Sequence, residues 1–431
     1  MNIYQNHPRE EWSQLLKRPV FDTSTLHKNV KTVLKDVRKR GDKAIKKYTK
    51  QFDEIDIKNF CVSVKEMHEA TASLPENLKN AIQLAADNIK AFHAKQLSQP
   101  EIIETMEGIR CWRKCTPIEK VGLYIPGGTA PLFSTILMLG IPATIAGCKE
   151  IILCSPPDKK GKLHPAILFT AQLVGVTRIF KIGGVQAIAA MAYGTETVPA
   201  VHKIFGPGNQ YVTHAKQLIQ HDGIAIDMPA GPSEVCVLAD ETSNASYVAA
   251  DLLSQAEHGA DSQVMLVSTS VDLVEEVMQE IQQQLRDIPR KKIAIQALEH
   301  SKAIVVNDID EAITLVNEYA PEHLILSCKN EEAIADKIIN AGSVFLGHYS
   351  PESVGDYASG TNHTLPTNGF AKVHSGVSVD SFVKKITYQK LTQQGLHNIS
   401  NIVIQMAEAE GLDAHANAVR VRMNPQPLKG S

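Results

Sequence analysis

The chain has 431 residues, 43% hydrophobic and 21% charged, with 44 Lys and Arg against 47 Asp and Glu. At roughly 150 residues per domain, this length predicts two to four domains, and a net charge of −3 excludes the polybasic surface typical of nucleic-acid-binding proteins. The apolar content excludes a disordered chain, so we expect a soluble globular protein.

One long stretch without charged residues, 121–148, raises the alternative of a membrane helix. Glycines and prolines interrupt it repeatedly, which a helix whose backbone must satisfy itself in lipid does not tolerate well. A buried strand, loop and helix is the better interpretation. The seven cysteines are odd in number and scattered, and the N-terminus has no apolar signal region. We therefore expect a reduced, cytoplasmic protein that does not contact membranes.

Helical patterns dominate the first hundred residues. Trp12 and Leu15 share one face of a short helix, which is too small to have its own core and must pack on another part of the molecule. Apolar residues at helical spacing then predict longer helices over 23–48 and about 76–96.

Two series of β-branched runs separated by helical segments predict two α/β units. The first series lies at 121–125, 151–155, 178–182 and 203–206. The second series lies at 234–239, 263–269, 303–307, 323–327 and 343–347. Such alternation is typical of mostly parallel sheets covered by helices on both faces. From Val377 onward the sequence is predicted to be helical again, with one amphipathic helix over 396–410.

Glycine-rich loops follow three predicted strands of the first unit, at 125–128, 181–184 and 205–209. Glycine at the carboxyl end of a parallel strand lets the backbone approach a ligand, and the next helix N-terminus favours anionic groups. Together the loops favour a nucleotide site, although each loop alone fits a tight strand-to-helix turn equally well. The dinucleotide fingerprint GxGxxG is absent, so the spacing does not identify the nucleotide.

Several polar side chains stand where they could bind a metal ion. Gln255 and His258 are three residues apart near the end of a predicted helix, which alone also fits an ordinary polar face. Asp356 lies in a Gly/Ser/Thr-rich segment that suits a site loop, and His415 follows Glu410 across a helix break. Such nitrogen and oxygen ligands suit Zn²⁺ or Mn²⁺ better than an iron–sulfur centre. The candidate ligands are Gln255, His258, Asp356 and His415.

Glu322 and His323 are candidates for acid–base chemistry. They follow Pro321 at the start of an apolar strand, and histidine titrates near working pH. A buried turn with a satisfied polar pair is the alternative interpretation. The cysteines lie outside CxxC pairs and outside these polar loops, which disfavours a cysteine nucleophile.

Seven motifs, taken jointly, resemble the signature series of the histidinol dehydrogenase family in order and in approximate spacing. They extend from about residue 120 to 420, and together they are much more specific than any one of them. The motifs are VGLYIPGG, FGPGNQYV, MPAGPSEV, LLSQAEHG, YAPEHL, SVGDYASGTNHTLPT and EGLDAHANAV.

The resemblance implies oxidation of L-histidinol to L-histidine through the aldehyde, at the end of histidine biosynthesis, with two NAD⁺ reduced at one Zn²⁺ site. The family's metal ligands match the four candidates above. His323 would take the hydroxyl proton and later a proton from the aldehyde hydrate, Glu322 would activate water, and His363 would be an auxiliary contact. Tyr124, Gln186 and Asn209 would contact NAD. The substrate contacts would be Ser233, Gln255, His258, His323, Asp356, Glu410 and His415.

The fold implied by the resemblance is α/β, with two incomplete Rossmann-like parallel-sheet domains and small helical N- and C-terminal segments in an intertwined homodimer. The first α/β domain would be discontinuous, and the ligand at His415 would come from the partner chain. The implied boundaries are 1–21 for the N-terminal segment, 22–118 with 233–372 for the first α/β domain, 119–232 for the NAD-binding domain and 373–431 for the C-terminal segment.

Two rival functions stay open at this point. A cysteine-dependent aldehyde dehydrogenase also makes an acid with NAD⁺, but it requires a catalytic thiol. A non-catalytic α/β protein could instead close over an amino-acid-like ligand.

Overall fold

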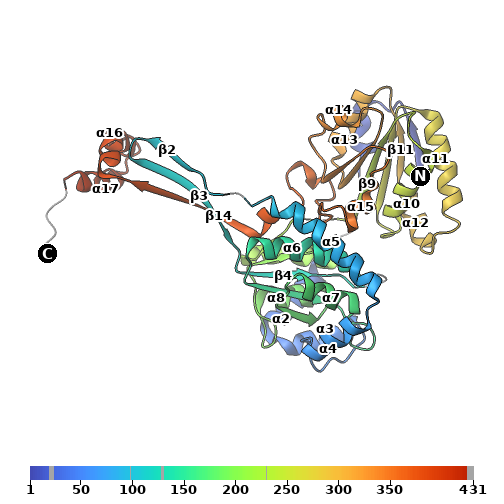
Figure 1. Ribbon diagram of the computed structural model, residues 1–431, viewed down its shortest axis with the longest axis horizontal. Coiled ribbons are helices and arrows are strands. Elements are labelled where there is room, and N and C mark those ends of the chain that lie inside the picture. Colours follow the sequence, from blue (N-terminus) through green and yellow to red (C-terminus); the bar gives the residue numbers. More distant parts are fainter. Residues whose placement is uncertain (19–23, 98, 128–130, 230, 425–431) are drawn as a thin grey trace. The chain divides into compact units, whose positions relative to one another are not determined.

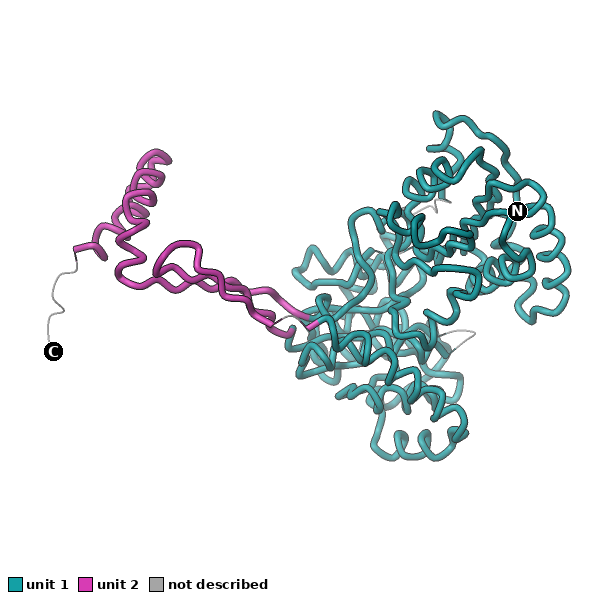
Figure 2. Tube along the Cα trace, turned by 45° about the horizontal axis from the view of Figure 1, so that its top comes forward, with its two compact units in different colours: residues 1–96, 118–382 teal, residues 97–117, 383–431 magenta. Residues whose placement is uncertain are grey.

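The computed structural model describes the chain except for residues 19–23, 98, 128–130, 230 and 425–431 (Figure 1). The chain divides into two compact units, which Figure 2 colours separately. Unit 1 comprises residues 1–96 and 118–382, and unit 2 comprises residues 97–117 and 383–431. The predicted four-part division of the chain stays a prediction.

A five-stranded parallel sheet, called sheet 1 here, lies in unit 1 with the order β6-β5-β4-β7-β8. Its strands are β4 (Lys120–Tyr124), β5 (Glu150–Ser155), β6 (Arg178–Lys181), β7 (Lys203–Phe205) and β8 (Ala225–Ile226). Counted along this part of the chain the order is 3-2-1-4-5, the doubly wound arrangement of Rossmann-like folds. The four strands predicted in this region are confirmed.

Helices cover both faces of sheet 1. One face packs against α2 (Ser24–Arg40), α3 (Asp42–Phe52), α8 (Gly184–Tyr193) and α9 (Gln210–Ile219). The other packs against α6 (Phe133–Ala146) and α7 (Pro165–Leu173), which in turn contact α5 (Glu76–Ala94) and α4 (Val64–Ser73). The helix predicted over 23–48 is two helices, because Gly41 between them adopts φ of +50°.

The charge-free stretch at 121–148 contains most of β4 and all of α6. This confirms its interpretation as a buried strand, loop and helix and not a membrane helix. Eleven of the fourteen residues of α6 are buried within the protein. Among the described residues, we find no helix with the length and apolar character needed to cross a membrane.

Sheet 2, a six-stranded parallel sheet also in unit 1, has the order β1-β11-β10-β9-β12-β13. Its strands are β1 (Asn2–Gln5), β9 (Glu234–Ala239), β10 (Gln263–Ser268), β11 (Lys302–Val305), β12 (His323–Ser327) and β13 (Ser343–Leu346). The five later strands, all predicted, repeat the 3-2-1-4-5 order of sheet 1. The short helix expected in the N-terminal segment is present as α1 (Trp12–Leu15). The helical description of this segment is wrong for residues 2–5, because they pair with β11 and extend the sheet edge.

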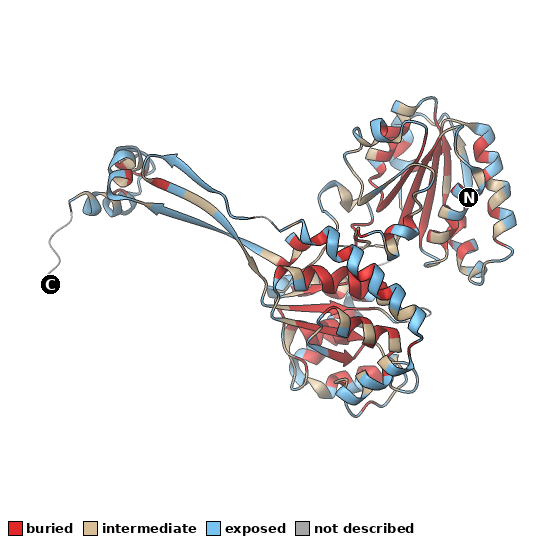
Figure 3. Cartoon of the chain, viewed as in Figure 1, coloured by how far each residue is buried: buried red, intermediate tan, exposed pale blue. Residues whose placement is uncertain are grey.

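Alternating residues of the sheet 2 strands face two separate cores. Val235 and Val237 pack with α10 (Ala245–Ala256), α11 (Val271–Gln284) and α12 (Lys291–Glu299). Cys236 and Leu238 pack with α1 (Trp12–Leu15), α13 (Ile309–Tyr319) and α14 (Glu331–Ala335). Figure 3 shows the central strands of both sheets, such as β4, β5, β9 and β12, mostly in red, the colour of buried residues. Burial on both faces explains why these strands are continuous apolar runs.

Unit 2 contains an antiparallel sheet of order β14-β3-β2 and two helices. Its elements are β2 (Ile102–Met106), β3 (Ile109–Pro117), β14 (Val383–Leu391), α16 (Gln393–Ala409) and α17 (Asp413–Met423). The prediction of helix from Val377 onward is wrong for β14, whose Ile, Thr and Tyr side chains suit a strand but are mostly exposed. The predicted helix over 396–410 is confirmed as α16.

Candidate active site

Glu322 and His323 lie at the amino edge of sheet 2, where β12 begins, and only 5% and 4% of their surfaces are exposed. The main chain of Glu234, the first residue of the neighbouring strand β9, contacts both. Its N–H donates to Oε2 of Glu322 over 2.8 Å, and its carbonyl oxygen lies 3.0 Å from Nδ1 of His323. Because a carbonyl oxygen can only accept, we assign the neutral His323 proton to Nδ1, which leaves Nε2 as the proton acceptor.

The charges around this pair are strongly coupled. Burial raises the pKa of Glu322 to about 8. For His323, burial lowers the pKa, but the carboxylates of Glu322 and Asp356 raise it more, so the pKa lies well above its usual value. Nε2 of His323 is 3.5 Å from Oδ1 of Asp356. A buried acid and imidazole held in this way can exchange protons with a bound molecule.

Gln255 and Asp356 bring oxygen atoms to the same region. Gln255 lies in the last turn of α10 with 1% of its surface exposed, and both polar atoms of its amide lack a hydrogen-bond partner in the structure. Oδ1 of Asp356 also lacks one. Asp356 was expected in a loop, which is wrong, because it lies on the short helix α15 (Glu352–Tyr357). Two buried, unpartnered oxygens on neighbouring elements suit a cation.

His258 lies just beyond α10, and its charge interacts with those of Asp356 and His323. Among the described residues, no group of three or more His, Cys, Asp and Glu side chains is arranged to hold a metal ion. Of the four predicted ligands, Gln255 is none of these residue types, and His415 belongs to unit 2, whereas the other three belong to unit 1. The predicted four-ligand site therefore stays a prediction, supported by the unpartnered oxygens of Gln255 and Asp356.

Glu352 is a buried carboxyl in this region that sequence reasoning missed. It begins α15, is 1% exposed, and its Oε1 accepts from the Ser254 hydroxyl over 3.3 Å. Burial raises its pKa to about 8. Its only signal in the sequence is the four-residue spacing to Asp356, which places both on one helix face.

His363 and its neighbour Asn362 link the Asp356 segment to α6, a helix that covers sheet 1. Its Nδ1 lies 2.8 Å from the carbonyl oxygen of Asp356, and its Nε2 lies 3.1 Å from the hydroxyl of Thr135 on α6. The neighbouring Asn362 donates to the carbonyl oxygen of Met138, also on α6, over 2.7 Å. Two hydrogen bonds therefore tie this segment to the helix that follows the first glycine loop.

A cavity of about 1430 Å³ lies at the carboxyl edge of sheet 1. The three predicted NAD contacts, Tyr124, Gln186 and Asn209, all line it. They follow or end three different strands, β4, β6 and β7, so the topology brings together what the sequence separates. This edge includes the point where the strand order reverses, between β4 and β7, which is where doubly wound folds bind ligands.

Each of the three residues has a defined local role. The Tyr124 hydroxyl accepts from the Gly184 N–H over 3.0 Å, whereas Oε1 of Gln186 is buried without a hydrogen-bond partner. Oδ1 of Asn209 caps α9 by accepting from the N–H groups of Tyr211 and Val212. The cap leaves the NH₂ group of Asn209 as its contact for a ligand.

Asp53 also lines the cavity, and sequence reasoning missed it. Nε2 of Gln186 lies 3.5 Å from Oδ2 of Asp53, and burial raises the pKa of Asp53 to about 6. At the predicted glycine loops, Gly128 lies outside the described residues. Gly206 adopts φ of +120°, and a Cβ there would lie 2.0 Å from the carbonyl oxygen of Tyr124, so this close approach requires glycine.

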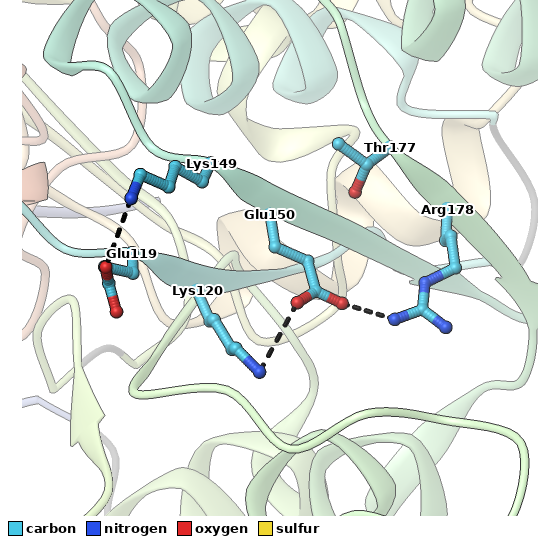
Figure 4. Close-up of a pocket in the computed structure, with 6 residues that line it drawn as sticks. All are labelled: Glu119, Lys120, Lys149, Glu150, Thr177 and Arg178. Carbon is cyan, nitrogen blue, oxygen red and sulfur yellow. Dashed lines mark hydrogen bonds and ion pairs between the residues drawn. The ribbon is translucent and has the colours of Figure 1, made fainter.

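The amino edge of sheet 1 is different, because charged side chains there pair with one another (Figure 4). Lys149 contacts Glu119 over 3.4 Å, Lys120 contacts Glu150 over 3.6 Å, and Arg178 also pairs with Glu150. Half-exposed ion pairs of this kind are ordinary surface features.

The remaining predicted contacts are less closely grouped. Ser233 immediately precedes β9 and is half-buried. Glu410 ends α16 and His415 lies on α17, both exposed on unit 2, with Gly411 breaking the helix as predicted. Within unit 1 the structure groups Glu322, His323 and Asp356, with His258 nearby.

Comparisons with known proteins agree with the motifs. The sequence profile described as histidinol dehydrogenase matches residues 16–423. Histidinol dehydrogenase of Bacteroides thetaiotaomicron is 58% identical over 98% of this chain and 99% of its own, and the chloroplastic one of Arabidopsis thaliana is 52% identical over 95% and 88%. The crystal structure of histidinol dehydrogenase from Elizabethkingia anophelis matches with a TM-score of 0.96 and 56% identity, over 98% of both chains. The chain belongs to the histidinol dehydrogenase family.

Proposed function

We propose that this protein oxidises L-histidinol to L-histidine through L-histidinaldehyde and reduces two NAD⁺, at the end of histidine biosynthesis. The observation that carries the proposal is the buried Glu322–His323 pair, which one residue of the next strand holds beside unpartnered oxygens. Membership of the histidinol dehydrogenase family supports the substrate.

His323 and Glu322 would move the protons in both oxidations. In the first, the neutral form of His323 accepts the hydroxyl proton at Nε2 while the carbinol carbon loses a hydride to NAD⁺. In the second, Glu322 accepts a proton from the water that adds to the aldehyde, and His323 accepts one from the hydrate as the second hydride leaves. A carboxyl with a pKa of about 8 can take and return protons near neutral pH.

We propose that Gln255, His258 and Asp356, with His415 of the partner subunit, hold Zn²⁺, with Mn²⁺ as the alternative. The metal ion would supply a Lewis acid that fixes the substrate. The unpartnered oxygens of Gln255 and Asp356 support a cation here, because burying them unsatisfied is costly. The substrate contacts proposed beyond this set are Ser233, His323 and Glu410.

The cavity at sheet 1 is proposed as the NAD site. NAD⁺ would supply the hydride acceptor for both oxidations. Tyr124, Gln186 and the NH₂ group of Asn209 would bind and orient it. Support comes from their shared cavity and from the unpartnered Oε1 of Gln186, which a donor on the cofactor would satisfy.

We also propose a homodimer formed through unit 2. Buried apolar side chains among its described residues are few, namely Ile109, Ala407 and Ala416. Its exposed apolar side chains include Ile102, Ile103, Met106, Ile402, Met406 and Val421, with 38–60% of their surfaces accessible. Exposed apolar surface on a small unit is typical of an interface.

The cysteine-dependent alternative is disfavoured for the thiols that burial shields most. Burial raises the pKa of Cys148 to about 11 and that of Cys154 and Cys236 further still. A catalytic cysteine needs the opposite shift, because the thiolate is the nucleophile. We propose that the enzyme works in the cytoplasm, where such thiols stay reduced.

Counting the products tests the function. With L-histidinol and NAD⁺, we expect two NADH for each histidine formed, measured by absorbance and by chromatography of the amino acid. Chelation should abolish turnover, and Zn²⁺ or Mn²⁺ should restore it. A yield of one NADH with accumulating aldehyde would contradict the four-electron reaction, and a chelator-resistant enzyme would contradict the metal site.

A hybrid dimer tests the shared site. His258→Asn and His415→Asn should each inactivate the homodimer. If the two ligands of one site come from different subunits, a hybrid of one His258→Asn chain with one His415→Asn chain has one intact site. We expect the hybrid, purified with two different tags, to recover about half of the wild-type turnover. An inactive hybrid would show that each chain supplies both ligands.

A further inference from the structure

Glu234 is unusual because its main chain and its side chain serve different partners. Its N–H and C=O hold Glu322 and His323, as described above. Its carboxylate faces Arg18, which donates from Nε to Oε1 over 2.5 Å and from Nη2 to Oε2 over 2.8 Å. Arg18 belongs to the N-terminal segment, 216 residues away in sequence.

This ion pair is largely shielded from water. Only 2% of the Glu234 side chain and 16% of the Arg18 side chain are exposed. The N–H of Asn368 also donates to Oε1 of Glu234, over 3.1 Å. Paired donors in a fixed fork give arginine a geometric precision that lysine lacks, and shielding makes each bond stronger.

Arg18 also contacts the segment that leads to the catalytic pair. Its guanidinium lies 4.0 Å from the centre of the Tyr319 ring, and Nη2 donates to the Tyr319 carbonyl oxygen over 2.9 Å. Tyr319 ends α13, and only Ala320 and Pro321 separate it from Glu322. One guanidinium therefore holds both the residue that orients the pair and the segment from which the pair emerges.

We propose that Arg18 is a positioning residue for the reaction, which acts through Glu234 to orient Glu322 and His323. The proposal rests on the catalytic roles proposed above for these two residues. Three hydrogen bonds hold the Glu234 carboxylate, and they oppose rotation of its main chain away from Glu322 and His323. Displacing a catalytic group by about 1 Å can slow chemistry roughly 100-fold.

The test compares Arg18→Met with the double variant Arg18→Met/Glu234→Gln. The single change leaves a buried carboxylate unpaired and could prevent folding. The double variant removes that charge, and its amide oxygen can still accept from Asn368. We expect the folded double variant to lose about 10- to 100-fold in kcat, while the KM values for histidinol and NAD⁺ change by less than about threefold.

An isotope measurement separates positioning from folding. With histidinol deuterated at the carbinol carbon, the isotope effect on kcat should increase in the double variant, because misplaced groups make hydride transfer more rate-limiting. Arg18→Lys should recover part of the lost kcat, since it keeps the charge but not the fork. Wild-type kcat per folded molecule, or an unchanged isotope effect, would overturn the proposal.

Two comparisons complete the design. Arg178→Met removes another Arg–Glu pair, at the amino edge of sheet 1, and should leave kcat and the isotope effect unchanged (Figure 4). Glu322→Gln and His323→Asn test the catalytic roles separately. If they keep wild-type turnover, the proposed chemistry fails. If they are inactive while the Arg18 variants have wild-type kinetics, the positioning role alone fails.

Discussion

The two parallel sheets of unit 1 share a strand order but use opposite edges. At sheet 1 the cavity lies at the carboxyl edge, where β4, β6 and β7 end. At sheet 2 the acid–base pair lies at the amino edge, where β9 and β12 begin. In both sheets the first and fourth strands of the 3-2-1-4-5 order contribute, so the topological position is the same and only the edge differs.

The other edge of each sheet carries polar contacts between its own residues. At sheet 1 these are the ion pairs of Figure 4. At the carboxyl edge of sheet 2, the Ser327 hydroxyl lies 2.9 Å from Nδ1 of His348, and the N–H of Lys329 donates to Asp240 over 2.9 Å. These bonds lie at the edge where a doubly wound fold commonly binds a ligand.

The difference follows from what each edge has to do. A dinucleotide needs a long groove and helix N-termini, which carboxyl edges provide. A proton-transferring pair needs burial and fixed main-chain partners. In sheet 2, strand register places the Glu234 N–H and C=O beside Glu322 and His323, as the pairing of His323 with Val235 shows.

The largest expected effect comes from the amino edge of sheet 2. His323→Asn should lower kcat by about 1000-fold with little change in KM, because it removes the proton acceptor and leaves the other proposed substrate contacts in place. Steady-state NADH formation measures both constants. His348→Asn, at the opposite edge of the same sheet, is the control and should stay within about twofold of the wild type. Equal losses in both variants would break the proposed division between the edges.

At sheet 1 we expect the opposite kinetic pattern, in which the main change is in a KM value and not in kcat. Gln186→Ala should raise the KM for NAD⁺ about tenfold and leave the KM for histidinol unchanged, since it removes a buried hydrogen-bonding amide from the cavity. Titration of NAD⁺ at saturating histidinol measures the effect. Gln172→Ala, an exposed change near the end of α7, is the matched control. An unchanged KM for NAD⁺ would remove Gln186 from the cofactor site.

A smaller effect concerns stability and pH at the same cavity. The folded pKa of Asp53, about 6, exceeds its ordinary value of about 3.9, so the folded chain binds this proton more tightly than the unfolded chain does. Asp53 therefore supports folding below pH of about 4, and this support is lost as the pH rises through 6. Denaturant unfolding should find Asp53→Asn more stable than the wild type by about 1 kcal/mol at pH 8, and not at pH 4. If the variant and the wild type were equally stable at pH 8, burial of Asp53 would not raise its pKa.

Much of unit 1 was predictable because its strands are buried on both faces. The runs at 234–239 and 323–327 coincide with β9 and β12, since continuous apolar segments between turn signals admit few other structures. In contrast, β14 was missed because its exposed residues show no apolar alternation. The short edge strand β1 was missed because its partner lies 300 residues later in the sequence.

The candidate site was only partly accessible from sequence for a similar reason. Glu322 and His323 stand in a recognisable motif, but Glu234 acts through its backbone, which no side-chain pattern records. The contact of Arg18 with Glu234 joins residues that are distant in sequence and follow no periodic spacing. Contacts between residues so distant in sequence are set by tertiary packing, so they can be recognised only in the folded structure.

One consequence of the Glu234 arrangement concerns redesign of the enzyme. A single residue anchors both Glu322 and His323. Under the roles proposed for these two residues, any substitution that shifts the Glu234 backbone should affect the alcohol and aldehyde oxidations together. An engineer who wants a catalyst that stops at the amino aldehyde should leave positions 18 and 234 intact and alter the Glu322 side chain alone. Under the proposed mechanism, the shared anchor couples the two oxidations, whereas the separate side chains of Glu322 and His323 allow them to be altered one at a time.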